Sequence, residues 1–313
     1  MNDITFHRPV LLQETLDLLE CRTGGVYVDG TVGGGGHSYE ILKRTSPDGI
    51  LIGLDMDDEA LAEAGRTLKG FDDRAVLLKS NFSEIKTIIA KLNIEKVDGI
   101  LLDLGVSSHQ LKTGSRGFSF SLDAPLDMRM DRQGALTAYD IVNSYSEREL
   151  KRIIRDYGEE RRTGRIVRAI LEQRRKSPIT TTTELAGLVS KVVPHRSGGK
   201  MIHPATRTFQ ALRIAVNDEL ENLRICIEDG IDILNKGGVF AIISFHSLED
   251  RIVKNLFRSW EKGCVCPPDF PVCTCGRESK LWVLTKRPVK PGVSEMEWNP
   301  RARSARLRAA KRI

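Results

Sequence analysis

A cluster of four consecutive glycines constrains the fold of this chain more than any other feature. Residues 33–36 are all glycine, and they closely follow the short apolar run 26–28 and the acidic Asp29. Consecutive glycines let a backbone turn sharply and approach a ligand where a Cβ atom would collide. A flexible surface turn is the alternative, but open α/β sheets bind their ligands between a buried strand and the next helix. The cluster therefore predicts a parallel α/β sheet with a ligand-binding loop after its first strand.

Short apolar runs alternate with helical patterns through the first third of the chain, which is typical of βαβ units in a parallel sheet. The pattern stops near residue 105 and resumes with a long helix at 208–234 and a turn at Gly237 and Gly238. Strands are expected at residues 26–28, 50–54, 75–78, 97–102, 239–243, 281–285 and 304–312. The last segment also suits a helix, because Ala, Leu and Arg favour helices.

The segment 111–207 shows no convincing buried strand and reads as a helical insertion. Amphipathic helical patterns are expected at residues 146–157, 163–175 and 182–193. Ser146 and Glu149 have the spacing of a capping box at the start of the first of these helices. The simplest account is a doubly wound α/β domain formed by residues 1–110 and 208–313, which the insertion interrupts.

The charge of the chain is modestly basic and unevenly distributed. The net charge is +6, and residues 145–176 alone carry eleven Lys and Arg against six Asp and Glu. Residues 301–313 carry six basic residues and no acid. Such clusters attract phosphates, although a solvated helix face is the alternative for any single run. No stretch approaches the roughly 18 apolar residues of a membrane span, and the first residues do not resemble a signal peptide, so a cytoplasmic protein is expected.

An acidic residue follows the glycine cluster at the distance expected for a nucleotide-type ligand. Asp55 ends the second expected strand about twenty residues after the loop, where an acid usually holds ribose hydroxyls. The dinucleotide pattern G-x-G-x-x-G does not fit, because Gly33 and Gly35 as its first glycines leave Ser38 at the third. Loops that bind S-adenosylmethionine read acid-x-Gly-x-Gly-x-Gly, and this sequence departs from that pattern at Thr31 alone. The chain therefore favours S-adenosylmethionine over NAD.

Two further polar residues are expected at the same edge of the sheet. Asp103 ends the fourth expected strand, and His246 follows the fifth. Because the carboxyl ends of parallel strands meet at one edge, both would lie near the glycine loop and are candidate catalytic residues. Capping of the next helix is the alternative role of Asp103, and a structural role is the alternative for His246.

Seven motifs, in one order, resemble the bacterial small-subunit ribosomal RNA (cytosine-N4)-methyltransferase family, also called RsmH or MraW. The similarity extends from His7 to the C-terminus. The motifs are D-G-T-x-G-x-G-G-H-S (29–38), D-L-G-V-S-S-x-Q (103–110), R-G-F-S-F (116–120), P-L-D-M-R-M (125–130), H-P-A-T-R-T-F-Q (203–210), S-F-H-S-L-E-D-R (244–251) and N-P-R-A-R-S (299–304).

The resemblance implies a Rossmann-like class I methyltransferase fold with an inserted helical RNA-recognition domain. It implies methylation of the exocyclic N4 amine of a cytosine in the decoding region of 16S ribosomal RNA, with ribosomal RNA or the small subunit as partner and neither DNA nor a membrane. Together with the loop pattern, it assigns cofactor contacts to Gly33, Gly35, Gly36, His37, Asp55, Phe82, Asp103 and Gln110.

The chemistry of this reaction suggests roles for some of these residues. The cytosine amine is a poor nucleophile, because its lone pair is delocalised into the ring. Acceptors at its protons, such as Asp103 or a backbone carbonyl near residues 106–108, would localise that pair during attack. The base would be extruded from its stack. Phe82 could cover the adenine or belong to the core, and Phe118 or Phe120 could stack on a base or anchor a loop.

Four cysteines, Cys264, Cys266, Cys273 and Cys275, fall within twelve residues. Two thiol pairs suit a tetrahedral Zn²⁺, although C-x-C is a less usual spacing than C-x-x-C, and reduced free thiols in a surface loop are the alternative. Methyl transfer does not call for a metal, so a zinc site here would be structural.

Two other functions stay open from the sequence. A non-catalytic ribosome-assembly factor could retain the fold as an RNA-binding module, and binding of S-adenosylmethionine would separate the two readings. An NAD-dependent enzyme is the third possibility, against which the missing third glycine counts.

Overall fold

The computed structural model describes residues 9–107, 110–111, 113–193, 203–264, 266, 270, 272 and 274–313. The chain divides into two compact units, Met1–Gly105 with Leu220–Ile313 and Val106–Glu219. We call them the α/β unit and the helical unit. The domain boundaries expected from the sequence, at residues 110 and 207, stay a prediction.

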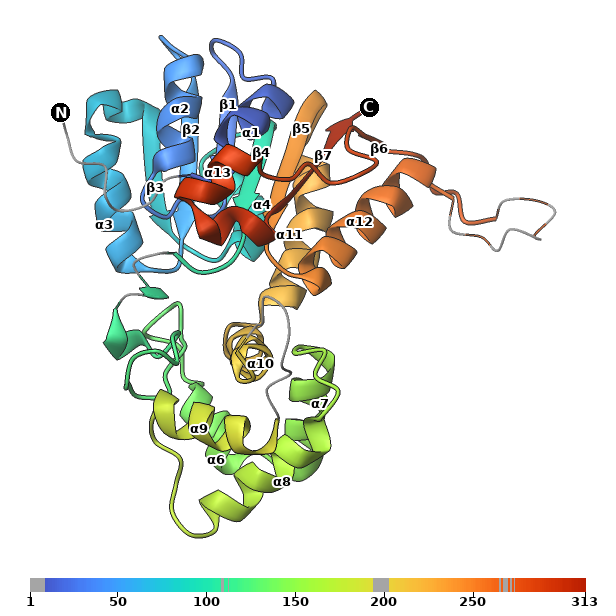
Figure 1. Cartoon of the computed structure of the whole chain (residues 1–313). Helices are drawn as coiled ribbons and strands as arrows, with labels where there is room; N and C mark the ends of the chain where they lie inside the picture. Colours follow the sequence, from blue (N-terminus) through green and yellow to red (C-terminus); the bar gives the residue numbers. More distant parts are fainter. Residues whose placement is uncertain are drawn as a thin grey trace. The chain divides into compact units, whose positions relative to one another are not determined.

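The α/β unit is built on a seven-stranded sheet in the order β3-β2-β1-β4-β5-β7-β6 (Figure 1). Its strands are β1 (Val26–Asp29), β2 (Ile50–Asp55), β3 (Ala75–Lys79), β4 (Val97–Asp103), β5 (Leu234–Ser244), β6 (Leu281–Val283) and β7 (Arg306–Arg312). Strands β1 to β5 are parallel, and β7 pairs antiparallel with both β5 and β6. The Rossmann-like α/β fold expected from the sequence is therefore confirmed, and residues 306–312 form a strand rather than a helix.

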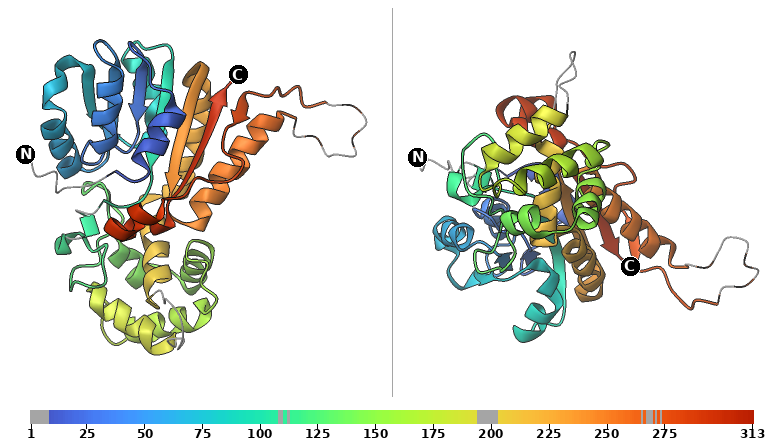
Figure 2. Two further views of the ribbon diagram at one scale, coloured as in Figure 1. Left: turned by 45° about the horizontal axis from the view of Figure 1, so that its top comes forward. Right: turned by 90° about the horizontal axis from the view of Figure 1, so that it is seen from below.

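Helices cover both faces of this sheet (Figure 2). They are α1 (Leu12–Leu19), α2 (Gly36–Arg44), α3 (Asp58–Thr67), α4 (Ile85–Lys91), α11 (Glu219–Ile233) and α12 (Ser247–Lys262). The short helix α13 (Val293–Trp298) has no buried residue. Successive strand residues point to opposite faces, so Val28 joins the core under α4, α11 and α12, while Tyr27 joins the core under α1 and α2. Both faces of the central strands are buried, which explains why β2 and residues 239–243 of β5 are mostly apolar.

Two expectations about the second half of the sheet are wrong in detail. The helix expected at 208–234 is two helices, because Asp218 adopts a left-handed conformation (φ 49°) that ends the first. Strand β5 begins at Leu234 and runs through the expected turn. The pairing of β4 with β5 shifts register between Val97 and Gly99, which accommodates Gly237 at φ +83°.

The helical unit contains α6 (Ala138–Ser144), α7 (Glu147–Asp156), α8 (Thr163–Arg174), α9 (Thr182–Val192) and α10 (Thr206–Asn217). The capping box of Ser146 and Glu149 is present at the start of α7, and equivalent boxes open α6 and α9. The helices bury one apolar core, which includes Phe118. Among the described residues of this unit, the only β-pairing is an isolated bridge between Pro125 and Thr181. No helix in the described part of the chain is long and apolar enough to cross a membrane.

Candidate functional site

Three carboxylates meet where the carboxyl ends of the parallel strands share one edge. Asp29, Asp55 and Asp103 are the last residues of β1, β2 and β4. The strand order departs in both directions from β1 and β4, so this is the switch point at which open α/β sheets bind ligands. The structure thus brings together the acids that the sequence analysis placed beside the glycine loop.

The glycine loop begins directly after Asp29 and needs glycine at two positions. Gly33 and Gly35 have φ values of +52° and +82°, and residues other than glycine rarely adopt positive φ values. A Cβ atom on Gly35 would lie 3.3 Å from the Cα atom of Ala64, so the loop packs closely against α3. Gly36 then starts α2. The loop is therefore a fixed part of the fold rather than a flexible turn.

Asp55 holds this loop in place. Its Oδ2 accepts a hydrogen bond from the Gly33 amide at 2.9 Å, and its Oδ1 accepts one from the Asp57 amide at 2.9 Å. Burial raises the pKa of Asp55 to about 6. Each oxygen keeps a second lone pair, so the carboxylate can accept hydrogen bonds from a diol as well.

Asp103 carries an acceptor that has no hydrogen-bond partner among the residues that the structure describes. This atom, Oδ1, is buried, while Oδ2 lies 3.7 Å from Nδ1 of His37. Nε2 of His37 lies 3.0 Å from the carbonyl oxygen of Val10, so that ring nitrogen carries the proton. Burial, followed by the charges of Asp29 and Glu249, raises the pKa of Asp103 well above its usual range. A buried acceptor of this kind needs a donor, which a bound ligand would provide.

Thr31, the one departure from the expected loop pattern, connects two strands. Its hydroxyl accepts a hydrogen bond from the Asp103 amide at 2.6 Å. Asp29, which is 1% exposed, accepts hydrogen bonds from the Ser38 hydroxyl at 2.7 Å and the Thr31 amide at 3.2 Å. Burial raises the pKa of Asp29 to about 6. The sequence analysis did not predict the roles of Thr31 and Ser38. The one available signal was that residue 31 is a polar threonine where the loop pattern has glycine.

The three carboxylates make this edge of the sheet suitable for a cation. Burial disfavours each negative charge, and a positive ligand would offset that cost. S-adenosylmethionine carries a sulfonium and an ammonium group, and its ribose offers two hydroxyl donors. The donor set and the orphaned oxygen of Asp103 therefore fit the cofactor that the sequence predicts.

Phe82 and Gln110 differ in what the structure says of them. Phe82 follows β3 and is half-buried. It packs against the apolar core that includes α4, while part of its side chain is exposed to solvent. Gln110 belongs to the helical unit. Its side-chain Oε1 accepts a hydrogen bond from the Ser107 backbone amide at 3.0 Å, and its backbone amide donates to the Ser107 hydroxyl at 3.1 Å. The cofactor contacts of both residues stay predictions.

His246 caps a helix. It is the N-cap residue of α12, and together with Glu249 it forms a capping box. Glu249 is 2% exposed and accepts hydrogen bonds from the amides of Phe245 at 2.8 Å and His246 at 3.1 Å. Ile243, near the end of β5, pairs with Asp103, so His246 does follow the expected edge. The structure shows that His246 caps α12, and its catalytic role stays a prediction.

The cysteine cluster lies on another part of the α/β unit. Cys264 follows α12 and Cys275 precedes β6, and their sulfur atoms are 3.9 Å apart. Cys266 joins them, while Cys273 lies outside the described residues.

Comparison with known proteins identifies the family to which the chain belongs. Residues 4–313 match the family model described as the MraW methylase family. The Ribosomal RNA small subunit methyltransferase H of Syntrophus aciditrophicus is 58% identical over 309 residues, which are 99% of this chain and 98% of the relative. The protein of the same name from Symbiobacterium thermophilum is 52% identical over 310 residues, 98% of this chain and 96% of the relative. An rRNA methylase from Streptococcus thermophilus, a solved structure, has a TM-score of 0.45 at 9% identity and covers 98% of each chain. The chain belongs to the MraW methylase family.

Proposed function

We propose that this protein is a methyltransferase that uses S-adenosylmethionine to methylate the N4 amine of a cytosine in the decoding region of 16S ribosomal RNA. One observation carries the proposal. This chain is 58% identical over 309 residues to a protein named Ribosomal RNA small subunit methyltransferase H, and its own glycine loop, Asp55 and Asp103 lie at the switch point of its sheet. The partner is accordingly ribosomal RNA or the small subunit, and the bacterial cytoplasm is the expected location.

Different residues of the α/β unit are proposed to contact different parts of the cofactor. Asp55 would accept hydrogen bonds from the ribose hydroxyls, and the loop from Gly33 to Gly36 would admit the methionine end. Phe82 would cover the adenine. When bound, S-adenosylmethionine supplies an electrophilic methyl group on its sulfonium sulfur.

Asp103 is suited to hold a proton donor near the reacting atoms. Its orphaned Oδ1 accepts a hydrogen bond either from the ammonium group of the cofactor or from the cytosine amine. In the second case it draws on an N–H proton and localises the nitrogen lone pair, which favours attack on the methyl group.

The helical unit offers exposed cations for the phosphates of RNA. Arg148, Arg152, Arg165, Arg168 and Arg175 are exposed. None of these five makes an ion pair within the described residues. Lys151 is also exposed and pairs with Glu147.

Part of this charge is contiguous. Lys151 first, and then Arg168 and Arg175, lower the pKa of Glu147, so these three cations, from α7, α8 and the residue that follows α8, lie on the side of one carboxylate. We call Lys151, Arg168 and Arg175 the basic patch. Phosphate contacts of this type supply affinity without sequence specificity.

A labelling experiment tests the proposal against the non-catalytic alternative. Small subunits from cells that lack this protein are incubated with the purified protein and S-adenosylmethionine labelled in its methyl group. The proposal predicts transfer of about one methyl group to each 16S RNA. An assembly factor would bind the cofactor or the subunit without transferring label, and that result would reject the proposal. The assembled subunit and free 16S RNA are used in parallel to identify the substrate form.

A further inference from the structure

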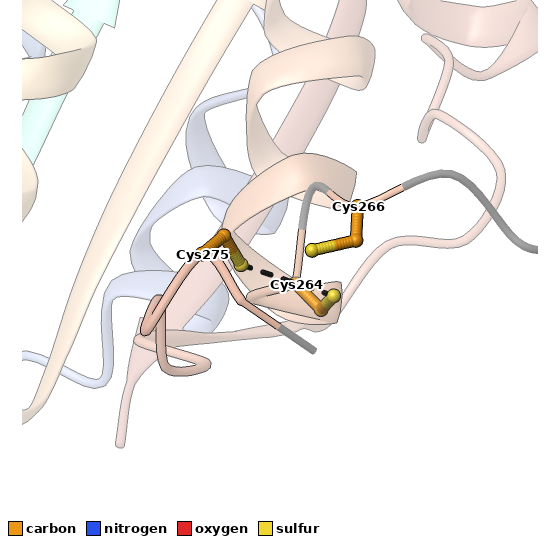
Figure 3. A group of neighbouring side chains, drawn as sticks. All are labelled: Cys264, Cys266 and Cys275. Carbon is orange, nitrogen blue, oxygen red and sulfur yellow. Dashed lines mark hydrogen bonds between the residues drawn. The ribbon is translucent and has the colours of Figure 1, made fainter. Parts of the chain in front are cut away.

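The cysteine cluster is outside the proposed catalytic site, yet its sulfur atoms converge. The Sγ atoms of Cys264, Cys266 and Cys275 all lie within 4.8 Å of one another, and those of Cys264 and Cys275 are 3.9 Å apart (Figure 3). Cys264 and Cys266 are half-buried, and Cys275 is exposed. Three thiols from two separate chain segments therefore share one small space near the surface.

Contacts that involve no thiol hold these two segments together. Gly263 ends α12 with φ +71°, and a Cβ atom there would lie 2.5 Å from the Ser279 nitrogen. The amide of Lys280 donates to the Trp260 carbonyl at 2.9 Å. The Arg277 guanidinium lies 3.6 Å from the centre of the Trp260 ring, a cation–π contact. The sulfur atoms thus sit on a frame that the rest of the fold already fixes.

The sulfur spacing suits a single tetrahedral ion. A Zn–S bond of about 2.3 Å in a regular tetrahedron places two sulfur atoms about 3.8 Å apart. The separation of Cys264 and Cys275, 3.9 Å, is close to that value. An iron–sulfur cluster distributes its thiolates over several irons, which requires wider spacing than this group has.

Polar groups of Thr274 and Cys275 lie against the sulfur atom of Cys266. The backbone of Thr274 and of Cys275 contacts its sulfur atom, and the Thr274 hydroxyl lies 3.9 Å from it. Donors aimed at a ligand sulfur orient it and offset its charge when it binds a metal.

We propose that Cys264, Cys266 and Cys275 bind one structural zinc ion that ties the end of α12 to the segment before β6. The sequence offers a further thiol, Cys273, which lies outside the described residues. The ion stabilises this part of the α/β unit and takes no part in methyl transfer.

Metal analysis of the full-length protein tests the proposal. The protein is purified without chelators or a histidine tag, and its metals are measured by inductively coupled plasma mass spectrometry. We expect about one zinc per chain, released when a mercurial reagent titrates the thiols. Iron in place of zinc, a disulfide found by intact mass under non-reducing conditions, or fewer than about 0.1 zinc per chain after growth in zinc-supplemented medium would overturn the proposal.

Variants identify the ligands. The double variant Cys264→Ser/Cys275→Ser should retain at least tenfold less zinc than the wild type. Cys21→Ser, at a half-buried cysteine outside the cluster, is the matched control and should keep its zinc. Zinc retained in full by the double variant would reject the assignment.

Cobalt titration gives a result even if the double variant fails to fold. Wild-type protein stripped of metal is titrated with Co²⁺, and one equivalent should produce the thiolate charge-transfer absorption of a tetrahedral sulfur site. Absence of that absorption would overturn the proposal.

Discussion

Replacing Asp55 by Asn probes the cofactor site with the smallest possible change. The side chain keeps its shape but loses its charge and one of its two acceptor oxygens. Asp55 now accepts hydrogen bonds from the amides of Gly33 and Asp57, both at 2.9 Å. An Asn amide nitrogen would face one of these donors in either orientation, so one backbone N–H loses its partner and one hydroxyl of the ribose loses an acceptor.

The expected loss follows from these contacts. A hydrogen bond to a charged group is worth about 1.5–3 kcal/mol, so the affinity for S-adenosylmethionine should fall about 10- to 150-fold. Isothermal titration calorimetry measures this directly, and circular dichroism verifies the fold.

Asp57→Asn is the matched control. Asp57 is 4% exposed and caps α3 by accepting from the Glu59 amide at 3.0 Å. Asn caps helices about as well as Asp, so this neutralisation should leave cofactor affinity within about twofold. A folded Asp55→Asn protein with unchanged affinity, or an equal loss in both variants, would refute the assignment of Asp55 to the ribose.

Three other outcomes are expected. Burial raises the pKa of Asp29 and Asp55 to about 6, so the free protein holds these protons below that pH and must release them to bind a cationic ligand. The contribution of these two groups to the affinity for S-adenosylmethionine should therefore be constant above about pH 7. It should fall as the pH drops below 6, by up to about tenfold per pH unit for each group, and calorimetry that finds no fall below pH 6 would contradict this. Thr31→Val leaves the buried amide at the end of β4 without its acceptor and should lower the free energy of unfolding by about 1–3 kcal/mol in urea titrations, whereas Thr31→Ser should restore most of it. Replacing Arg168 and Arg175 by Glu should weaken RNA binding and reduce its dependence on salt, while cofactor affinity stays unchanged. An unaltered slope of log affinity against log salt concentration would show that these residues do not contact RNA phosphates.

Local patterns were enough to predict the central parallel strands, because both faces of these strands are buried and their sequences are mostly apolar. The basic sequence of β7 did not separate a strand from a helix. The break at Asp218 was not predictable, since Asp adopts a left-handed conformation only where the surrounding structure requires it. The acids at the site were predictable from their place after each strand. The link from Thr31 to Asp103 was not, because it joins residues far apart in the sequence.

Burial also decided between alternatives that the sequence left open. Phe118 is 7% exposed in the core of the helical unit, so it anchors its loop and is not available to stack on a base. Phe120 is half-buried and stacks on His203, with ring centres 4.5 Å apart. No local pattern distinguishes these two aromatic residues, because their difference arises from the packing of the whole unit.

The chemical identity of the product tests the central claim most directly. 16S RNA from small subunits treated with the protein and S-adenosylmethionine is digested to nucleosides and to defined fragments, and both are analysed by liquid chromatography and mass spectrometry. The account predicts one new N4-methylated cytidine, located in the decoding region and absent when the protein is omitted. A methyl group on carbon 5 of cytosine, on another base, or on no nucleoside at all in the presence of bound cofactor would contradict it.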